Sequence, residues 1–253
     1  MFRPTGAAIV SAMTETLIDI VAVPGAERWL AVTPDGAAAG VISLRPEFSL
    51  GPDPPLALGP GAPELSLHVA PAWRRRGVGS RLLAAVRERT TGPRLVADVV
   101  PGTPGEAFCV RHGFRLTVAR RHDLLTYCEV HGAWLGELVD AEHPGYDLTY
   151  GSLGGSVLVA ANAGDELAAY AVAVVDTLPR AALHGPTVRP GHRGHALGAW
   201  VSAALIQRVR QLHPHVDEIA TVTAEDDPDL LAQRADLGFH PSRRTRLYEL
   251  ALP

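Results

Sequence analysis

Short periodic segments of hydrophobic and polar residues follow one another along the chain, and their order occurs twice. Apolar–polar alternation is typical of half-buried strands, and an apolar stripe at three- and four-residue spacing is typical of helices. In the first half these rules predict strands at 27–32, 39–44, 64–69 and 95–100 and helices at 79–89 and 105–112. In the second half they predict strands at 157–161, 168–175 and 218–222 and helices at 199–212 and 228–236.

Residues typical of turns separate these segments. Residues 33–36 (Thr-Pro-Asp-Gly) predict a hairpin between the first two strands, and the turn at 164–165 predicts its counterpart in the second half. The Pro- and Gly-rich residues 49–63 are expected to form a loop, and Gly113 is expected to end a helix. Residues 128–143 predict a helical connector between the halves.

Matching positions in the two halves keep a nearly constant separation. Val69 and Val188 each precede a Gly-bearing loop and lie 119 residues apart. Gly113-Phe114 and Gly238-Phe239 each follow a short helix and lie 125 residues apart. A near-constant offset in matching order indicates an internal duplication.

Composition narrows the class of protein. The chain has 253 residues, 47% hydrophobic residues and a net charge of −4, which is enough apolar material for a core and excludes a disordered chain. The sequence shows no apolar run of membrane-spanning length and no leader-like start, so we expect a cytoplasmic protein that does not bind membranes. All 23 basic residues are Arg, which excludes lysine Schiff-base chemistry and the Walker A loop. Scattered Arg in a mildly acidic chain also argues against nucleic-acid binding.

The segment from Val69 to Ser80 carries the strongest local signal. A strand ends, a loop with three arginines and two glycines follows, and a helix begins at once. Glycines let a backbone approach a ligand closely, and a helix N-terminus offers unpaired N–H groups and positive potential. This arrangement predicts a pyrophosphate-binding loop that needs no lysine.

These residues resemble the GCN5-related N-acetyltransferases (GNAT family). The family's acetyl-CoA loop, Q/R-x-x-G-x-G/A, is matched by residues 74–79 (RRRGVG), with Val69-x-Pro71 before it and Gly113-Phe114 after it. The resemblance implies two tandem GNAT-like α+β domains, residues 1–128 and 129–253, each a mixed twisted sheet with helices on both faces. It also implies acetyl-CoA, or another acyl-CoA, as cofactor and an amine-bearing small molecule as acceptor.

The second half carries a related loop, residues 193–198 (RGHALG), in which Ala196 replaces the central glycine. An alanine forced to positive φ costs on the order of 1 kcal/mol. Residues 188–198 and 221–239 are similar to the tandem GNAT proteins of actinobacteria, which usually have asparagines where this chain has Thr223 and Asp227. The interval from Gly145 to Val157 is too short for the helices that cover the family's acceptor pocket. We therefore expect one working site, in the first half.

The resemblance assigns cofactor-binding residues in both halves, since pantetheine pairs in this family with the strand before the loop. In the first half these are Leu67, His68, Val69, Arg74, Arg75, Arg76, Gly77, Val78, Gly79 and Ser80. In the second half they are Val188, Arg193, Gly194, His195, Ala196, Leu197 and Gly198, with Thr187 beside them.

Acyl transfer from a thioester to an amine needs a base for the amine proton, a donor for the carbonyl oxygen and an acid for the thiolate. Glu64, on the strand that leads to the loop, is the candidate base, with an exposed strand-end glutamate as the alternative. A backbone N–H near Val69 is the expected carbonyl donor. The family's usual acid is a Tyr four residues before the Gly-Phe glycine, where this chain has Cys109 and Arg234. Cys109 can serve as the acid only if it is exposed; otherwise it packs in the core.

Other functions stay open at this point. The missing tyrosines and Ala196 favour a non-catalytic acyl-CoA-binding protein as the rival to an N-acetyltransferase. A dinucleotide-binding oxidoreductase would need a third glycine, where position 82 is Leu. The histidines lack Cys or acidic partners at metal-ligand spacing, so no metal is expected, and the chain is expected to be a monomer or a homodimer.

Overall fold

The computed structural model describes residues 18–45, 48–50, 58–60, 62–90, 92–130, 132–153, 156–175 and 179–252. Twelve strands form one mixed sheet in the order β1-β2-β3-β6-β7-β14-β8-β13-β12-β11-β10-β9. The strands of the first half are β1 (Asp19–Ala22), β2 (Arg28–Val32), β3 (Ala38–Arg45), β6 (Glu64–Val69), β7 (Arg94–Val99) and β8 (Arg115–Thr126). Those of the second half are β9 (Asp147–Leu153), β10 (Ser156–Ala163), β11 (Glu166–Val174), β12 (Arg180–Val188), β13 (Glu218–Ala224) and β14 (His240–Ala251). The α-helices are α1 (Val78–Arg89), α2 (Pro104–Arg111), α3 (Gly132–Asp140), α4 (Leu197–Leu212) and α5 (Pro228–Asp236).

The periodic segments fold as predicted, with small shifts at their ends. The α+β class and the mixed sheet are confirmed, and Gly36 and Gly113 take the positive φ that their turn and helix end require. Strands β1, β8 and β9 were not predicted. The expectation of a loop over 49–63 is wrong in part: β4 (Phe48–Leu50) pairs with β5 (Leu58–Pro60), because a strand at a sheet edge tolerates proline. Residues 51–57 and 61 lie outside the described residues.

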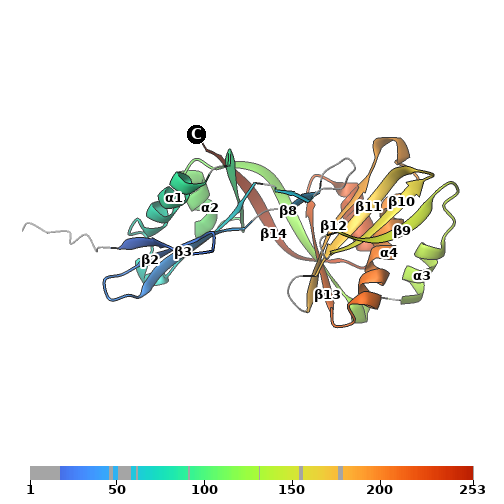
Figure 1. The fold of residues 1–253 in the computed structure, drawn as a ribbon, viewed down its shortest axis with the longest axis horizontal. Helices are drawn as coiled ribbons and strands as arrows, with labels where there is room; N and C mark the ends of the chain where they lie inside the picture. Colours follow the sequence, from blue (N-terminus) through green and yellow to red (C-terminus); the bar gives the residue numbers. More distant parts are fainter. Residues whose placement is uncertain are drawn as a thin grey trace, which may run out of the picture.

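The last strand of each half pairs with the other half. Strand β14 lies between β7 and β8 and is antiparallel to both, and β8 in turn is antiparallel to β13. Figure 1 shows β8 and β14 running through the waist between two lobes, with the C-terminus in the lobe that carries α1 and α2. The sheet is therefore continuous across the predicted domain boundary between residues 128 and 129. That boundary stays a prediction.

The described helices cover one face of this sheet. Helices α1 and α2 pack with Leu65, Leu95 and Ala97 in one hydrophobic cluster. In the second half α4 packs on β10, β11 and β12, and Arg234 of α5 bonds to β12. Helix α3 packs against α4. The expectation of helices on both faces does not hold for the described residues. Two connections in the first half join parallel strands, β6–α1–β7 and β7–α2–β8, and both move in the same direction along the sheet. Because such connections are right-handed, both helices lie on the same side of the sheet. We call the other side the open face.

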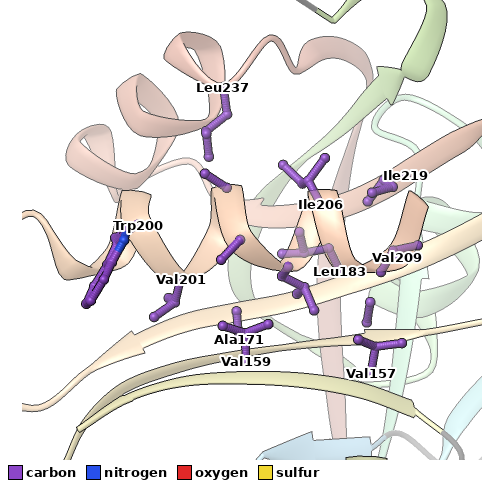
Figure 2. Close-up of a cluster of buried hydrophobic side chains, with 14 of the residues drawn as sticks. Val157, Val159, Ala171, Leu183, Trp200, Val201, Ile206, Val209, Ile219 and Leu237 are labelled. Carbon is purple, nitrogen blue, oxygen red and sulfur yellow. The ribbon is translucent and has the colours of Figure 1, made fainter. Parts of the chain in front are cut away.

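Each half has its own hydrophobic core. Figure 2 shows the core of the second half, where Val201 and Val209 of α4 point towards the strand residues Val157, Val159 and Ala171, and Ile206 lies on the opposite side of the helix. The core of the first half contains Leu82, Leu83 and Val86 of α1 and also Tyr248 and Leu250 of β14. The first core is therefore completed by a strand from the end of the chain.

An acidic side chain joins α2 to that strand. Glu106 accepts hydrogen bonds from the Gly102 amide at 2.7 Å, from Arg246 at 2.6 Å and from the Tyr248 hydroxyl at 2.8 Å. These bonds, that of the Gly102 amide first, lower the pKa of Glu106 to about 2. The contact therefore holds the C-terminal strand against the first half while Glu106 is ionised.

Replacing Glu106 with Gln is expected to lower the melting temperature by an amount that depends on pH. The folded-state pKa is depressed, so the stabilisation is fully present above the ordinary pKa of 4.5 and is lost as the pH falls towards about 2. Melting curves of the wild type and Glu106→Gln between pH 7 and pH 2 should converge only in that acidic range. A gap between the two proteins that does not change with pH would contradict this.

Candidate functional site

Strands β6 and β7 are parallel but pair at only one position, Glu64 with Val96. At the end of β6 the Ala70 amide donates to the Ala39 carbonyl, on the side of β3. Just before β6 the Pro63 carbonyl accepts from the Val96 amide, on the side of β7. Because backbone groups alternate sides along a strand, the amides and carbonyls of Leu67 and Val69 point towards β7 without a ladder partner. We call this stretch, Leu65–Val69 beside Ala97–Val99, the first splay.

One of these groups is already occupied. Arg74 Nε donates to the Val69 carbonyl at 3.0 Å. This leaves the Leu67 amide and carbonyl and the Val69 amide for a ligand that pairs like a strand. Pantetheine carries two amides in an extended chain, so the donor and acceptor pattern of the first splay fits it.

The predicted phosphate-binding loop lies at the end of β6, where Pro71–Trp73 form a short 3-10 helix and α1 follows. Gly77 is the N-cap of α1 with φ 79°, and Arg75 also has positive φ, at 63°. No side chain caps the helix, so the first amides of α1 stay free for an anion. A Cβ at Gly77 would meet nothing within 4 Å, which leaves open space beside those amides.

The start of α1 packs tightly on α2. A Cβ at Gly79 would lie 3.1 Å from Phe108 and 3.4 Å from Leu67. A glycine at this position is therefore needed for close packing, and its φ is not positive. Ser80 Oγ lies 3.1 Å from His112 Nε2. Burial, with smaller contributions from nearby arginines, lowers the pKa of His112 and so favours the neutral ring at this contact.

The loop of the second half has the same backbone conformation. Ala196 is the N-cap of α4 with φ 54°, and Gly194 has φ 86°, at the positions that match Gly77 and Arg75. The central position therefore takes positive φ in both loops, and alanine adopts it at a cost in strain. Asp227 caps α5, because its side chain accepts a hydrogen bond from the Leu230 amide.

The second pair of parallel strands differs from the first in its backbone groups. Strands β12 and β13 pair over four positions, from Arg180–Glu218 to Leu183–Thr221, and diverge only afterwards. Pro186 lies where the first half has Leu67, and proline has no amide hydrogen to donate. The Gly185 carbonyl beside it accepts a hydrogen bond from Arg234. The second half thus lacks the amide donor that Leu67 offers in the first splay.

Arg234 is fully buried in α5, at the position where the family's tyrosine was sought. Its guanidinium lies over the Phe239 ring, 5.2 Å from the centroid. Burial lowers its pKa to about 10, partly offset by the nearby Asp123 carboxylate, so it stays charged at neutral pH. The sequence located this residue but gave no sign that its side chain bonds to the backbone of β12.

The open face of the first splay carries polar side chains. Glu64, Ser66 and His68 share this face of β6, and Asp98 shares it on β7, because Glu64 and Val96 are paired and alternate residues point the same way. Glu64 lies at the narrow end of the splay, 3.7 Å from Arg45, with its side chain 34% exposed. Helices α1 and α2 do not cover this face, because they pack on the other one.

Cys109 lacks the exposure on which an acid role depends. It is 3% exposed in the core of the first half, and burial, together with Glu106, raises the pKa of its thiol to about 11. The side chain is a packing element of α2. The sequence leaves open whether Cys109 is an exposed acid or a core residue. Its predicted helix has so small an apolar stripe that helical periodicity does not place position 109 on the buried side.

Within the described residues, no group of three or more His, Cys, Asp or Glu side chains is arranged to hold a metal ion. None of the helices in the same ranges is long and apolar enough to cross a membrane.

The comparisons with known proteins bear on the fold and on the first half of the chain. Residues 6–114 match the model of the acetyltransferase (GNAT) family. The chain is similar to the solved structure of a tandem GNAT protein from the clavulanic acid biosynthesis pathway, at 24% identity and a TM-score of 0.66, over 89% of this chain and 82% of that one. No match exists among curated proteins.

Two further solved structures share the fold. A GCN5-related N-acetyltransferase from Sphaerobacter thermophilus is 13% identical with a TM-score of 0.60, over 90% of this chain and 81% of that one. A glucosamine N-acetyltransferase region of a fungal multi-domain GH3 β-N-acetylglucosaminidase is 14% identical with a TM-score of 0.64, over 88% of this chain and 33% of that one. At such identities the likeness establishes the fold alone.

Proposed function

We propose that this chain, whose residues 6–114 match the GNAT family model and whose fold is similar to that of a tandem GNAT protein, is an acyltransferase. It would transfer the acetyl group of acetyl-CoA, or a related acyl group, to an amine of a small molecule at the first splay. The observation that carries this proposal is that two kinds of free backbone group follow each other along one strand and the helix after it. Leu67 and Val69 offer unpaired backbone groups to an extended ligand, and the free amides of α1 follow at the end of the same strand. A molecule with an amide-bearing arm and a diphosphate matches both.

Acetyl-CoA supplies a thioester whose carbonyl carbon forms a C–N bond with the amine as the C–S bond breaks and the thiol sulfur takes a proton. The Val69 amide points into the splay and is the proposed donor to the thioester oxygen. Glu64, on the open face, is the proposed acceptor of the amine proton, directly or through water. Because Cys109 is buried, the proton for the sulfur is assigned to solvent.

We propose that the second half binds no acyl-CoA. Residues 193–198 keep the loop conformation, but Pro186 offers no amide and Arg234 occupies the Gly185 carbonyl. The second half then acts as structural support and as a source of strand β14. A calorimetric titration is expected to show one acetyl-CoA per chain, and a stoichiometry of two would contradict the single site.

Replacing Glu64 with Gln is expected to slow acetyl transfer about 100-fold while leaving acetyl-CoA affinity unchanged, because a positioned base contributes about that much to the rate. Acetyl transfer would be followed by mass spectrometry of products from a panel of primary amines. Glu218→Gln is the matched control, since Glu218 also pairs with an arginine at the narrow end of its parallel strands. Equal rates in both variants would remove Glu64 from the mechanism.

The buried Cys109 favours a second candidate, a non-catalytic acyl-CoA-binding protein, because it leaves the first half without a side-chain acid at that position. The two functions predict different outcomes of the same assay. Saturable acetyl-CoA binding with no acetylated product from any amine would favour the second candidate, and the absence of binding would overturn both.

A further inference from the structure

Three side chains from distant parts of the sequence meet on the open face. Asp98 of β7, His122 of β8 and Thr245 of β14 form one hydrogen-bonded group: His122 Nε2 lies 3.3 Å from Asp98 Oδ2 and 2.8 Å from Thr245 Oγ1. The Asp98 and His122 side chains are each 13% exposed, and Thr245 is 3% exposed. The group therefore lies at the floor of the open face rather than in either core.

The Asp98 carboxylate is only partly satisfied by these contacts. Its Oδ2 meets His122, but its Oδ1 is buried and has no hydrogen-bond partner among the described residues. A buried carboxylate oxygen without a donor is costly, and in a native protein it commonly marks the place of a missing ligand or water. Burial works against ionisation here, but hydrogen bonds from His122 and Thr245 keep the pKa of Asp98 below its ordinary value. Asp98 is therefore an anion that lacks one donor.

The position of Asp98 links this group to the first splay. The Val96 amide donates to the carbonyl of Pro63, the residue before β6, so by alternation the backbone of Asp98 also faces β6, while its side chain stands on the open face. Asp98 thus borders the splay on the β7 side, as Ser66 and His68 do on the β6 side. The helices lie on the opposite face and leave this side to the acceptor.

We propose that Asp98 binds the ammonium group of a cationic acceptor, and that His122 and Thr245 hold its carboxylate in place for this contact. The inference rests on the proposed function and adds to it the chemical class of the acceptor. An ammonium brings both the positive charge and the N–H donors that Asp98 Oδ1 lacks. Glu64, across the splay, is then placed to take a proton from the same nitrogen before it attacks.

The second half of the chain contributes to this site through strand exchange. Thr245 belongs to β14, which lies between β7 and β8 only because the C-terminal strand inserts into the first half. Each half is therefore needed for the acceptor site, although only one binds the acyl donor. This gives the second half a functional role beside its structural one.

The test is steady-state kinetics of the full-length protein with lysine, putrescine, glucosamine and glycinamide as acceptors. Asp98→Asn is expected to raise the KM of the cationic acceptors about 10- to 100-fold, since hydrogen bonds to charged groups are worth about that much. Its kcat and its acetyl-CoA affinity should change little. Thr245→Val is expected to raise KM about 3- to 10-fold, because it removes only one of the contacts that orient the carboxylate.

Glu249→Gln is the matched control. Glu249 is a carboxylate on β14 that pairs with Arg94 of β7 at 3.4 Å, four residues along β7 from Asp98. It lies outside the splay and should leave KM unchanged. If Asp98→Asn and Glu249→Gln have the same KM for the cationic acceptors, the proposal is overturned. It is also overturned if Asp98→Asn loses affinity for acetyl-CoA and for the acceptor to the same extent, because such a loss would indicate a folding defect.

A binding measurement covers the case in which no acceptor in the panel is turned over. The ring signals of His122, assigned with His122→Gln, are expected to shift in NMR spectra when a cationic acceptor is added to the acetyl-CoA complex, and not to shift in Asp98→Asn. Failure of every amine to move these signals would overturn the proposal. Failure to bind acetyl-CoA would instead overturn the proposed function, and the amine titration of the free protein would then decide on Asp98 alone.

Discussion

Residues 1–128 and residues 129–253, expressed as separate chains, are each expected to fail to fold and to form a soluble complex when expressed together. The reason is the exchange of strands at the waist of the molecule. Without the second fragment, β7 and β8 lose β14 between them, and without the first fragment, β13 and β14 lose β8. Each fragment would then expose long unpaired strand edges, which promote aggregation.

The size of the effect follows from what β14 buries. Leu247, Tyr248 and Leu250 are each less than 9% exposed, and the last two belong to the core of the first half. Burial of a large apolar side chain is worth about 1.5–3 kcal/mol, so their loss removes roughly 5–9 kcal/mol. That is comparable with the whole free energy of unfolding of a typical domain, about 5–15 kcal/mol.

Size-exclusion chromatography and circular dichroism of the single and co-expressed fragments would measure this. The co-expressed pair should elute as one complex with a cooperative thermal transition, and Leu247→Asn in the second fragment should weaken it. Two fragments that each melt cooperatively as soluble monomers would show that the halves are independent domains, and the strand exchange would then contribute little to stability.

Gly77→Asp is expected to weaken acetyl-CoA binding by more than 100-fold, while Ala196→Asp leaves it unchanged. Both positions are helix N-caps in the left-handed region, at 79° and 54°, so the two substitutions are matched in backbone geometry. At Gly77 the new carboxylate would stand beside the amides proposed to hold the diphosphate. Two like charges about 4 Å apart near a protein surface repel by up to about 4 kcal/mol, and 100-fold in affinity needs about 2.7 kcal/mol.

Isothermal titration calorimetry at constant ionic strength would measure both variants. Asp tolerates the left-handed region better than most residues, so α1 should still form, and the melting temperature of each variant would verify that. A loss of affinity in Ala196→Asp equal to that in Gly77→Asp would place a working loop in the second half. Unchanged affinity in both would show that neither loop holds the diphosphate.

The local parts of this site could be predicted from the sequence because they depend on neighbouring residues. Gly77 is followed at once by a helix, so its conformation and the free amides of α1 follow from positions 74–80 alone. The sequence also singled out Ala196 at the matching position, and the cost of positive φ applies there because its φ is 54°. The offset of 119 residues between Val69 and Val188 revealed the duplication without any knowledge of which strands pair.

The remaining features depend on contacts between segments far apart in the chain. Even where hydrophobic alternation predicts a strand, it does not tell which strands are its neighbours. The pairing of β8 and β14 with the opposite half could therefore not be predicted. The fate of Arg234 could not be predicted either, since its partner, the Gly185 carbonyl, lies 49 residues away on another strand.

The sequence by itself therefore determined the periodic elements, the two Gly-bearing loops and the resemblance that they carry, because these are set by backbone preferences within a few residues. Only the tertiary structure decided which splay keeps free backbone groups, which face the helices leave open, and that Asp98, His122 and Thr245 meet there. Those outcomes depend on strand order and register, which are fixed by the packing of whole sheets and not by any local pattern.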